Sequence, residues 1–355
     1  MSVDGIPYTL TRLHTLMQPE PGNVLEAEGV LNPASGRGPD GELYLLPRIV
    51  ADGNVSRVGI ARIVVEDGVP VGVERQGVVL EPANRWEQGA RTAGTEDPRV
   101  TWVEALGVHV MTYVAYGPFG PRTALAVSED LRTWRRLGPL HFEYDPELDV
   151  DLNLYPNKDV VVFPEVVLDP EGTPSFALLH RPTWDLGSIR AGERIWPPSG
   201  HDDPRPSIWI SYSPAASVLE DLASLTCQRG SRELARPAFP FEELKIGAGP
   251  APVRVPEGWL LLHHGVTGEI RDPWSTDNDV RYSVGAMILD ADEPHRVLAR
   301  SAEPLMVPEA PHELEGTVDQ VVFPTAIEEI DGHRFVFYGM ADAKIGVARL
   351  DRIDA

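Results

Sequence analysis

The stretch SRVGIARIVVEDG (Ser56–Gly68) combines a short alternating strand and a small residue with an acidic turn, and this combination occurs five times in the chain. Successive copies begin at residues 56, 122, 207, 281 and 344, so they are spaced 66, 85, 74 and 63 residues apart. Each interval has room for a four-stranded sheet and its loops, which is the repeating unit of a β-propeller. The other copies are RTALAVSEDLRTW (Arg122–Trp134), SIWISYSPAASVLEDL (Ser207–Leu222), RYSVGAMILDADEP (Arg281–Pro294) and KIGVARLDRID (Lys344–Asp354).

Apolar, β-rich segments lie between these copies, and each ends in polar residues: ELYLLPRIV, HVMTYVAYG, SFALLHRP, GWLLLHHGV and RFVFYGMAD. No stretch longer than about ten residues has clean helical periodicity. The sequence therefore predicts an all-β fold, a five-bladed β-propeller that directs its polar clusters at a central channel. A β-sandwich with fortuitous internal similarity is the alternative. We expect residues 1–22 to form an N-terminal arm and residues 23–355 to form a single propeller domain.

Composition restricts the partners of the chain. Its 355 residues carry a formal net charge of −23, which argues against nucleic acid, because proteins that bind it usually have a basic stripe. The single cysteine, Cys227, excludes an intrachain disulfide and a cysteine-built metal site. No apolar run approaches the roughly 18 residues of a membrane span, and the start MSVDGIPYTL has no signal-peptide pattern. We therefore expect a cytoplasmic protein with no membrane partner, for which a homo-oligomer stays open.

The string EDPR contains the first candidate for acid chemistry. Asp97 precedes Pro98, and the residue before a proline is usually extended. We therefore expect an extended backbone at Asp97, with its carboxyl group fixed toward the channel. The alternative is an Asx-type turn beside a surface ion pair between Glu96 and Arg99.

Basic residues are scarce, with 31 Lys and Arg against 54 Asp and Glu, yet several lie at the ends of apolar strands. These are Lys158, Arg181, Lys245 and His264. If the fold brings them together, they form a compact anion site, since Arg offers a bidentate fork, Lys a point charge and His a donor. The alternative for each is a salt bridge to a neighbouring acid. His263 and His264 face opposite sides of a strand, so they are no paired metal-ligand set, and we expect no metal site.

Seven strings, in order along the chain, resemble sequences of glycoside hydrolase family 130. The resemblance extends from about Asn32 to Arg349. It implies a five-bladed propeller that acts as a β-mannoside phosphorylase or, as in some members, a β-mannosidase. The strings are GTEDPRVTW (Gly94–Trp102), NKDVVVFPE (Asn157–Glu165), LLHRP (Leu178–Pro182), KIGAGPAP (Lys245–Pro252), HHGV (His263–Val266), YSVGAMILD (Tyr282–Asp290) and VVFPTA (Val321–Ala326).

The resemblance also implies roles for individual residues. Asp97 matches the catalytic acid of the family, which in the phosphorylases passes its proton to the glycosidic oxygen through a sugar hydroxyl. Lys158 stands where some members have arginine. The implied phosphate ligands are Lys158, Arg181, Lys245, His264 and Tyr282. The implied sugar ligands are Asn32, Arg48, Arg57, Asp159 and Asp342, the last of which is alternatively a turn residue. Candidate aromatic walls, with ordinary packing as the alternative, are Tyr116, Phe119 and Trp184.

The cations bear on the choice between two reactions. An inverting hydrolase needs a second carboxylate to activate water, whereas a phosphorylase needs cations to hold phosphate. The presence of Arg181, Lys245 and His264 favours phosphorolysis of a β-mannoside oligosaccharide, with inorganic phosphate as co-substrate, no other cofactor and α-mannose 1-phosphate as a product. The alternatives are an inverting β-mannosidase and a non-catalytic sugar-binding propeller. Candidate bases for the hydrolase are Glu165, Glu193 and Glu313. The linkage and the acceptor sugar stay open.

Overall fold

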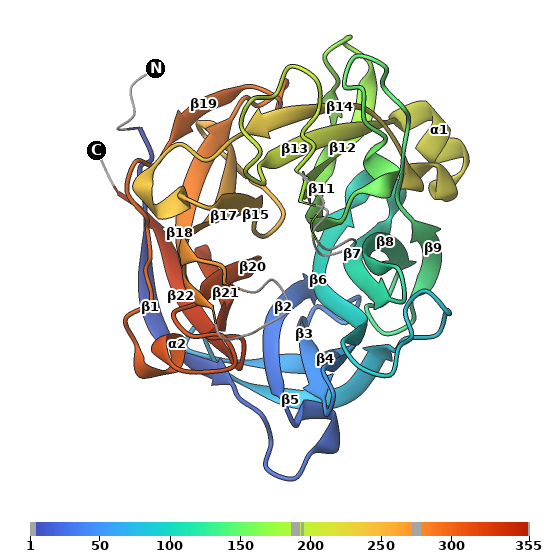
Figure 1. The fold of residues 1–355 in the computed structure, drawn as a ribbon. Coiled ribbons are helices and arrows are strands. Elements are labelled where there is room, and N and C mark those ends of the chain that lie inside the picture. Colours follow the sequence, from blue (N-terminus) through green and yellow to red (C-terminus); the bar gives the residue numbers. More distant parts are fainter. Residues whose placement is uncertain (1–4, 186–191, 193–194, 272–277, 354–355) are drawn as a thin grey trace.

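A computed structural model describes residues 5–185, 192, 195–271 and 278–353 of the chain. Strands make up nearly all of their regular structure, which confirms the all-β expectation. Strand pairing gives four sheets, and the largest consists of two antiparallel units joined by a short parallel bridge, Val55–Ser56 with Ala93–Gly94. The structure therefore contains five antiparallel units, each built on four strands. These units surround a common centre (Figure 1), rather than forming two layers, and we interpret this ring as the expected five-bladed propeller.

Four of the units run outward from the centre in chain order, and in the fifth the N-terminal strand takes the outermost place. The strands nearest the centre are β2 (Gly29–Arg37), β6 (Ala93–Val103), β11 (Asn157–Leu168), β15 (Lys245–Ala248) and β20 (Val322–Ile330). The second strands are β3 (Leu43–Ala51), β7 (Val108–Gly117), β12 (Pro174–Pro182), β17 (Gly258–Glu269) and β21 (His333–Met340). These second strands contain the five apolar segments that separate the sequence repeats.

The five sequence repeats occupy equivalent places in the ring. Each contributes the third strand of its unit, so the spacing of the repeats is the spacing of the sheets. The third strands are β4 (Val55–Glu66), β8 (Gly120–Ser128), β13 (Ile208–Pro214), β18 (Asp279–Leu289) and β22 (Lys344–Arg352). The fourth strands are β5 (Val69–Leu80), β9 (Arg135–Pro139), β14 (Cys227–Ala235), β19 (Val297–Arg300) and, from the N-terminus, β1 (Tyr8–Met17).

The N-terminal strand completes the last sheet. β1 pairs antiparallel with β22 from Tyr8–Arg352 to Met17–Ile345, so the two ends of the chain share one sheet. Pairing with β1 covers an edge of β22 that would otherwise be exposed. The expected division of the chain at residue 22 stays a prediction.

The remaining elements are short. Two additional strands are β10 (His141–Phe142), which pairs with β14, and β16 (Val253–Val255), which continues the line of β15 along β17. The helices are α1 (Ala215–Glu220), α2 (Pro311–Leu314) and the 3-10 turns η1 (Val24–Glu26), η2 (Glu104–Leu106), η3 (Leu152–Leu154), η4 (Leu222–Thr226) and η5 (Pro240–Glu242). None of the helices in the described residues has the length and apolar character to cross a membrane.

Apolar side chains fill the spaces between neighbouring sheets. Between the third and fourth units, for example, the fully buried rings of Phe163 and Trp259 meet edge to face, with centroids 5.5 Å apart. Such burial of large aromatic groups is a main source of stability in a layered β fold. It also fixes the first strands, from which much of the candidate site extends.

Three of the units contain a buried glutamate that contacts two backbone N–H groups, an arginine and a tyrosine or histidine side chain. In Glu313, Oε2 accepts the backbone N–H groups of Glu309 and Ala310 at 2.9 and 3.0 Å, and Oε1 accepts the Tyr338 hydroxyl (2.8 Å) and Arg12 Nε (2.7 Å). Each carboxylate thus ties a loop to the second and fourth strands of its unit. The equivalent sets are Glu87 with Ala83, Asn84, Tyr113 and Arg136, and Glu242 with Ala238, Phe239, His263 and Arg300. We call Glu87, Glu242 and Glu313 the three structural glutamates.

Candidate functional site

Three of the first strands, β2, β6 and β11, carry a β-bulge, and a predicted site residue occupies each bulge. Asn32, Asp97 and Asp159 have φ values of 42°, 45° and 53°, each within a register shift of its strand. Asn and Asp tolerate this left-handed region better than most residues, and bulges redirect side chains next to active sites. The expectation of an extended backbone at Asp97 was therefore wrong, because the bulge outweighs the preference imposed by Pro98.

Asp97 lies in a cluster of carboxylates and cations. Its Oδ1 accepts hydrogen bonds from Asn32 Nδ2 (2.8 Å) and Arg48 Nη1 (3.1 Å). Arg48 also donates from Nη2 to Glu96 Oε1 at 3.0 Å. The other oxygen of Glu96 is 4.0 Å from Lys158 Nζ. We call Asn32, Arg48, Glu96, Asp97 and Lys158 the acid cluster.

The charges of this cluster set its protonation. Burial by itself raises the pKa of Asp97, but the charges of Arg48 and Lys158 outweigh this effect and hold the pKa below its ordinary value. Burial raises the pKa of Glu96 despite the same two cations. Asp342, a half-buried neighbour, has a pKa raised to about 6 by burial, against the pull of Arg48. Three carboxyl groups therefore compete for two cations, which is typical of sites that handle protons.

A second cluster surrounds Asp159. Its Oδ2 is 2.5 Å from Arg181 Nε and 3.6 Å from His264 Nε2. The His264 ring stacks on Tyr282, with centroids 5.8 Å apart, and Lys245 Nζ lies 5.3 Å from the centre of the Tyr282 ring. Among the described residues, no carboxylate is within 4.0 Å of Lys245. We call Asp159, Arg181, Lys245, His264 and Tyr282 the anion cluster.

Charge in the anion cluster is partly compensated. Although burial raises the pKa of Asp159, the charge of Arg181 and its hydrogen bond lower it strongly, so this carboxylate is ionised. Burial lowers the pKa of His264 well below its ordinary value, and the ring is therefore uncharged near neutral pH and can donate from one nitrogen. Arg181 thus has a salt-bridge partner, as the alternative interpretation held, whereas Lys245 has none among the residues that the structure describes.

The contact between Asp159 and His264 depends on a glycine. Gly247 pairs with His264 across β15 and β17, and a Cβ atom at Gly247 would lie 2.2 Å from Asp159 Oδ2 and 2.4 Å from His264 Cε1. Any larger residue would force these two side chains apart. Gly247, the first of two glycines in the string KIGAGPAP, is therefore required by close approach rather than by its backbone angles.

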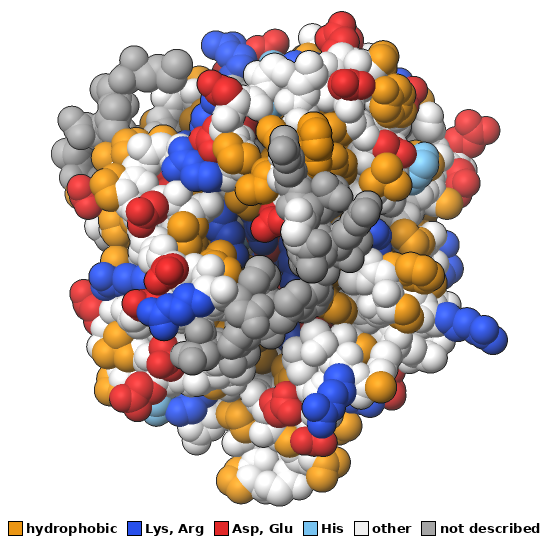
Figure 2. All heavy atoms as spheres, in the orientation of Figure 1, with side chains coloured by type: hydrophobic (Ala, Val, Ile, Leu, Met, Phe, Trp, Pro, Cys, Tyr) orange, Lys and Arg blue, Asp and Glu red, His pale blue; other side chains and the backbone are white. Residues whose placement is uncertain are grey.

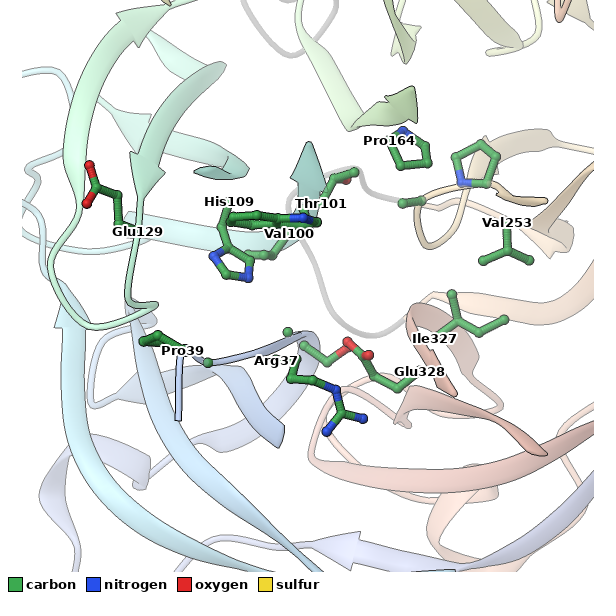
Figure 3. Close-up of a pocket in the computed structure, with 16 residues that line it drawn as sticks. Arg37, Pro39, Val100, Thr101, His109, Glu129, Pro164, Val253, Ile327 and Glu328 are labelled. Carbon is green, nitrogen blue, oxygen red and sulfur yellow. The ribbon is translucent and has the colours of Figure 1, made fainter. Parts of the chain in front are cut away.

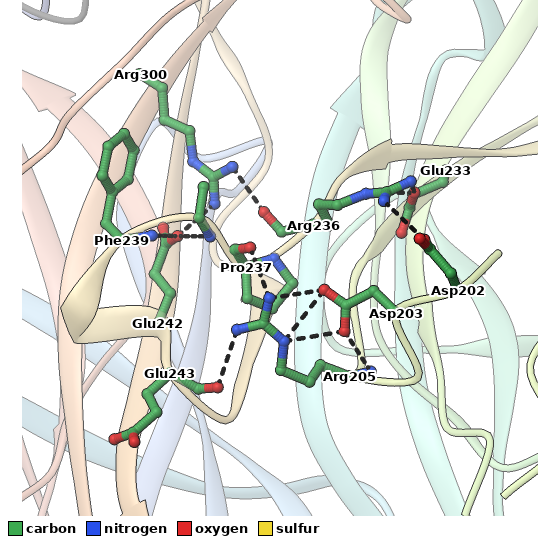
Figure 4. Close-up of polar contacts among 11 residues, drawn as sticks. Asp202, Asp203, Arg205, Glu233, Arg236, Pro237, Phe239, Glu242, Glu243 and Arg300 are labelled. Carbon is green, nitrogen blue, oxygen red and sulfur yellow. Dashed lines mark hydrogen bonds and ion pairs between the residues drawn. The ribbon is translucent and has the colours of Figure 1, made fainter.

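Arginines hold the segment that delivers Lys245 to the site (Figure 4). Arg205 donates to the backbone carbonyls of Pro237 and Glu243, both at 3.1 Å. Its own guanidinium is fixed by a bidentate pair with Asp203, from Nε to Oδ1 and from Nη2 to Oδ2. Arg300 donates to the carbonyl of Arg236 at 2.7 Å. These bonds restrain the backbone of residues 236–243, which leads into β15 and Lys245.

Arg99 lies between the two clusters and was missed as a site residue. It is 2% exposed, donates to the backbone oxygens of Asp97 (3.2 Å) and Gly249 (3.0 Å), and lies 5.3 Å from the Phe323 ring, which contacts His264. The alternative of a surface pair between Glu96 and Arg99 is wrong, because both are buried and bond elsewhere. The position of both residues beside Asp97 in a matched string was the available signal.

The other sequence candidates fall in different places. Arg57 lies 3.7 Å from Glu81, and its described contacts include no other predicted site residue. Tyr116 is half-buried below Lys158 Nζ, 5.6 Å from the ring centre, so it borders the acid cluster. Phe119 is 73% exposed, and Trp184 is fully buried against Tyr155 and Trp209. Trp184 therefore packs in the core, as the alternative held.

The carboxylates considered as hydrolytic bases are poorly suited to that role. Glu313 is one of the three structural glutamates, and it is fully buried with both oxygens bonded. Glu165 pairs with Arg254 at 3.1 Å on an exposed surface. Glu193 lies outside the described residues. Neither described candidate contacts the acid cluster or the anion cluster.

The face that carries both clusters is hollowed near the centre of the ring, where basic and acidic side chains gather (Figure 2). A separate cavity of about 510 Å³ lies farther along the first strands (Figure 3). Its lining includes Ser35, Thr101 and Glu328, which follow the bulges by several residues of about 3.3 Å each, so it belongs to the opposite end of the channel. Among the described residues, no group of three or more His, Cys, Asp or Glu side chains is arranged to hold a metal ion.

Comparison with known proteins identifies the family. Residues 24–353 match the sequence model of glycoside hydrolase family 130, described as beta-1,4-mannooligosaccharide phosphorylase. The chain belongs to this family, as the resemblance implied. It is 30% identical to 1,2-beta-oligomannan phosphorylase of Thermoanaerobacter sp. (strain X514), over 77% of this chain and 72% of that protein. It is 28% identical to beta-1,4-mannooligosaccharide phosphorylase of Ruminococcus albus, over 80% and 70% of the two chains.

Solved structures share the fold. Beta-1,2-mannobiose phosphorylase from Listeria innocua, in complex with beta-1,2-mannobiose, superposes with a TM-score of 0.70 at 23% identity, over 98% of this chain and 97% of that one. A glycoside hydrolase from Bacteroides ovatus gives the same TM-score at 22% identity, over 98% of both chains. At 22–23% sequence identity, these structural similarities establish a shared fold and nothing more specific.

Proposed function

We propose that this chain is an inverting β-mannoside phosphorylase that transfers a mannosyl unit from an oligosaccharide to inorganic phosphate. The observation that carries the proposal is that the anion cluster lies beside the acid cluster. Lys158 of the acid cluster and Asp159 of the anion cluster are adjacent on β11, and Arg99 lies between the two clusters. Arg181, Lys245 and a donor on His264 match the needs of phosphate, which is bound by charge-assisted hydrogen bonds. Family membership supports the same chemistry.

In the proposed reaction, a phosphate oxygen attacks the anomeric carbon of the mannosyl unit from the face opposite the leaving group. The bond between this carbon and the glycosidic oxygen breaks, and the proton of Asp97 passes to that oxygen, by way of a sugar hydroxyl as in the family. The products are α-mannose 1-phosphate and a shortened sugar. Asn32, Arg48 and Asp342 surround the carboxyl and are suited to hold the mannosyl hydroxyls.

The lowered pKa of Asp97 in the free protein has a role in this scheme. An acid must be protonated before it donates, whereas Arg48 and Lys158 favour the ionised carboxylate. Bound phosphate adds negative charge next to these cations and thereby raises the pKa of Asp97. Phosphate is then both the nucleophile and the group that prepares the acid.

The proposal also covers the domain organisation of the enzyme, its location and its linkage specificity. We propose one catalytic domain over residues 23–355, to which the arm of residues 1–22 adds β1 as the fourth strand of the last unit. A cytoplasmic location, the homo-oligomer and the binding roles of individual residues stay predictions. The relatives act on different linkages, β-1,2 and β-1,4 by name, so family membership does not choose the linkage.

The test is a kinetic series over phosphate concentration with β-1,2- and β-1,4-mannooligosaccharides. We expect release of mannose 1-phosphate that requires phosphate. Lys245→Ala should raise the KM for phosphate about 10- to 100-fold, because a lost charge-assisted hydrogen bond costs about 1.5–3 kcal/mol. The KM for the mannoside should change little. Arg254→Ala, which removes a cation paired with Glu165, is the matched control and should leave both constants unchanged.

Two results would contradict the proposal in different ways. Release of free mannose at a rate independent of phosphate would indicate the hydrolase. No turnover of any β-mannoside in either direction would indicate a sugar-binding propeller.

A further inference from the structure

Glu96 connects the two cations of the acid cluster without being a predicted site residue. It is 3% exposed, and its two oxygens contact different cations: Oε1 accepts from Arg48 Nη2 at 3.0 Å and Oε2 lies 4.0 Å from Lys158 Nζ. These cations come from different sheets, since Arg48 is on β3 and Lys158 is on β11. A single buried carboxylate therefore holds two units of the ring together at the point where Asp97 lies.

The same cations act on Asp97. Arg48 reaches both carboxylates at once, with Nη1 on Asp97 Oδ1 at 3.1 Å and Nη2 on Glu96. Lys158 lowers the pKa of both groups. The positive charges of Arg48 and Lys158 are thus shared between Glu96 and Asp97, which are adjacent on one strand. The part of this charge that Glu96 neutralises does not stabilise the ionised form of Asp97.

We propose that Glu96 is a positioning residue for phosphorolysis, which holds Arg48 and Lys158 and takes up part of their charge so that Asp97 can carry the proton that it donates. This inference rests on the proposed function. It differs from a purely structural role because it predicts how the reaction depends on pH, and not only that the fold needs the residue.

All charged and titratable groups around Glu96 enter this balance. Arg48 and Lys158 face it from β3 and β11, Asp97 is its neighbour on β6, and Tyr116 and Asp342 lie within electrostatic range from β7 and the loop after β21. Removal of the negative charge of Glu96 leaves both cations to Asp97 and Asp342. Since an unopposed cation favours ionisation, the pKa of Asp97 must then fall further.

Glu96→Gln tests the proposal through the pH profile in both directions of the reaction. In phosphorolysis Asp97 must be protonated, so the alkaline limb of the kcat/KM profile should move to lower pH by about one unit or more. In the reverse synthesis from mannose 1-phosphate, Asp97 must be ionised, so the acidic limb should move to lower pH by a similar amount. The titration of phosphate itself is common to parent and variant and therefore cancels.

Lys158 provides variants with the opposite sign. Lys158→Met removes a cation, which raises the pKa of Asp97, and should therefore move the same limbs to higher pH. Lys158→Arg keeps the charge and should leave both limbs within about 0.3 units of the parent. If Glu96→Gln fails to fold, as judged by thermal melting, unmoved limbs in Lys158→Met would still overturn the proposal, because Asp97 would then not respond to a cation that Glu96 holds.

An equal loss of activity at every pH in folded Glu96→Gln, with both limbs unmoved, would overturn the proposal. Shifts of the same sign in Glu96→Gln and Lys158→Met would overturn it as well. If the parent protein needs no phosphate, the proposed function fails instead, and that result is read from the parent before any variant is measured.

Discussion

The acid cluster and the three structural glutamates use similar groups in opposite ways. Both contain buried carboxylates bonded to arginine. Around Glu313, one oxygen accepts two backbone N–H groups and the other accepts a tyrosine hydroxyl and an arginine. Around Asp97, the adjacent Glu96 competes for the same cations, and the backbone of Asp97 is left-handed.

This difference separates stability from function. A carboxylate with every acceptor position filled by fixed donors has one favoured protonation state and secures the fold. A carboxylate that shares its cations with a neighbour can change its protonation at low cost, and backbone strain of this kind persists where the surrounding structure enforces it. We therefore expect changes in the acid cluster to affect turnover and changes at the structural glutamates to affect stability.

The largest expected effect is on turnover in Asp97→Asn. The substitution is nearly isosteric, and it removes a proton donor that contributes on the order of 10²- to 10⁴-fold to the rate. Mannose 1-phosphate release should fall by that factor, while the melting temperature stays close to that of the parent. Retention of more than about half of the parental rate would exclude Asp97 from the mechanism.

The next effect is on stability in Glu313→Gln. The side-chain amide of glutamine would place an N–H donor against groups that are themselves hydrogen-bond donors. It would also leave Arg12 without its buried carboxylate partner. The free energy of unfolding should therefore fall by about 3–5 kcal/mol. Glu309→Gln is the matched control, since Glu309 also pairs with Arg12, at 3.3 Å, but is 66% exposed. Its denaturation midpoint should hardly change. Equal midpoints for the two variants would remove the contrast between buried and exposed partners.

A smaller effect concerns the stability of the fold in acid. Burial tends to raise the pKa of Glu242, but the bond from His263 and the charge of Arg300 lower it from 4.5 to about 2. The carboxyl of the unfolded chain takes up its proton near pH 4.5, so ionised Glu242 stabilises the fold fully above this pH and progressively less as the pH falls toward 2. Urea denaturation of parent and Glu242→Gln should show a difference in stability that shrinks by on the order of 3 kcal/mol over this range. A constant difference from pH 6 to pH 2 would contradict the lowered pKa.

The smallest effect is expected at Glu165. Its pair with Arg254 is exposed, and such pairs contribute about 0–1 kcal/mol. Glu165→Gln should therefore leave both turnover and stability close to the parent. A loss of turnover comparable to that of Asp97→Asn would instead favour the hydrolase, with Glu165 as its base.

The sequence determined the order of the strands. The five repeats are the third strands of five units and the segments between them are the second strands, because alternating patterns and acidic turns are local features that the chain keeps wherever it folds. The matched strings also contained most residues of both clusters, since those residues lie at strand ends that the pattern already marked.

Only the tertiary structure decided which of these residues meet. Lys158 and Asp159 are neighbours in sequence, yet one contacts Glu96 and the other contacts Arg181 and His264. The left-handed backbone of Asp97 was likewise hidden, because a bulge arises from pairing between strands, and its neighbour Pro98 suggested the opposite. The sequence also suggested a surface pair between Glu96 and Arg99, because nothing local showed that both residues are buried. Burial and the sharing of charge depend on contacts between distant strands, and no local pattern encodes them.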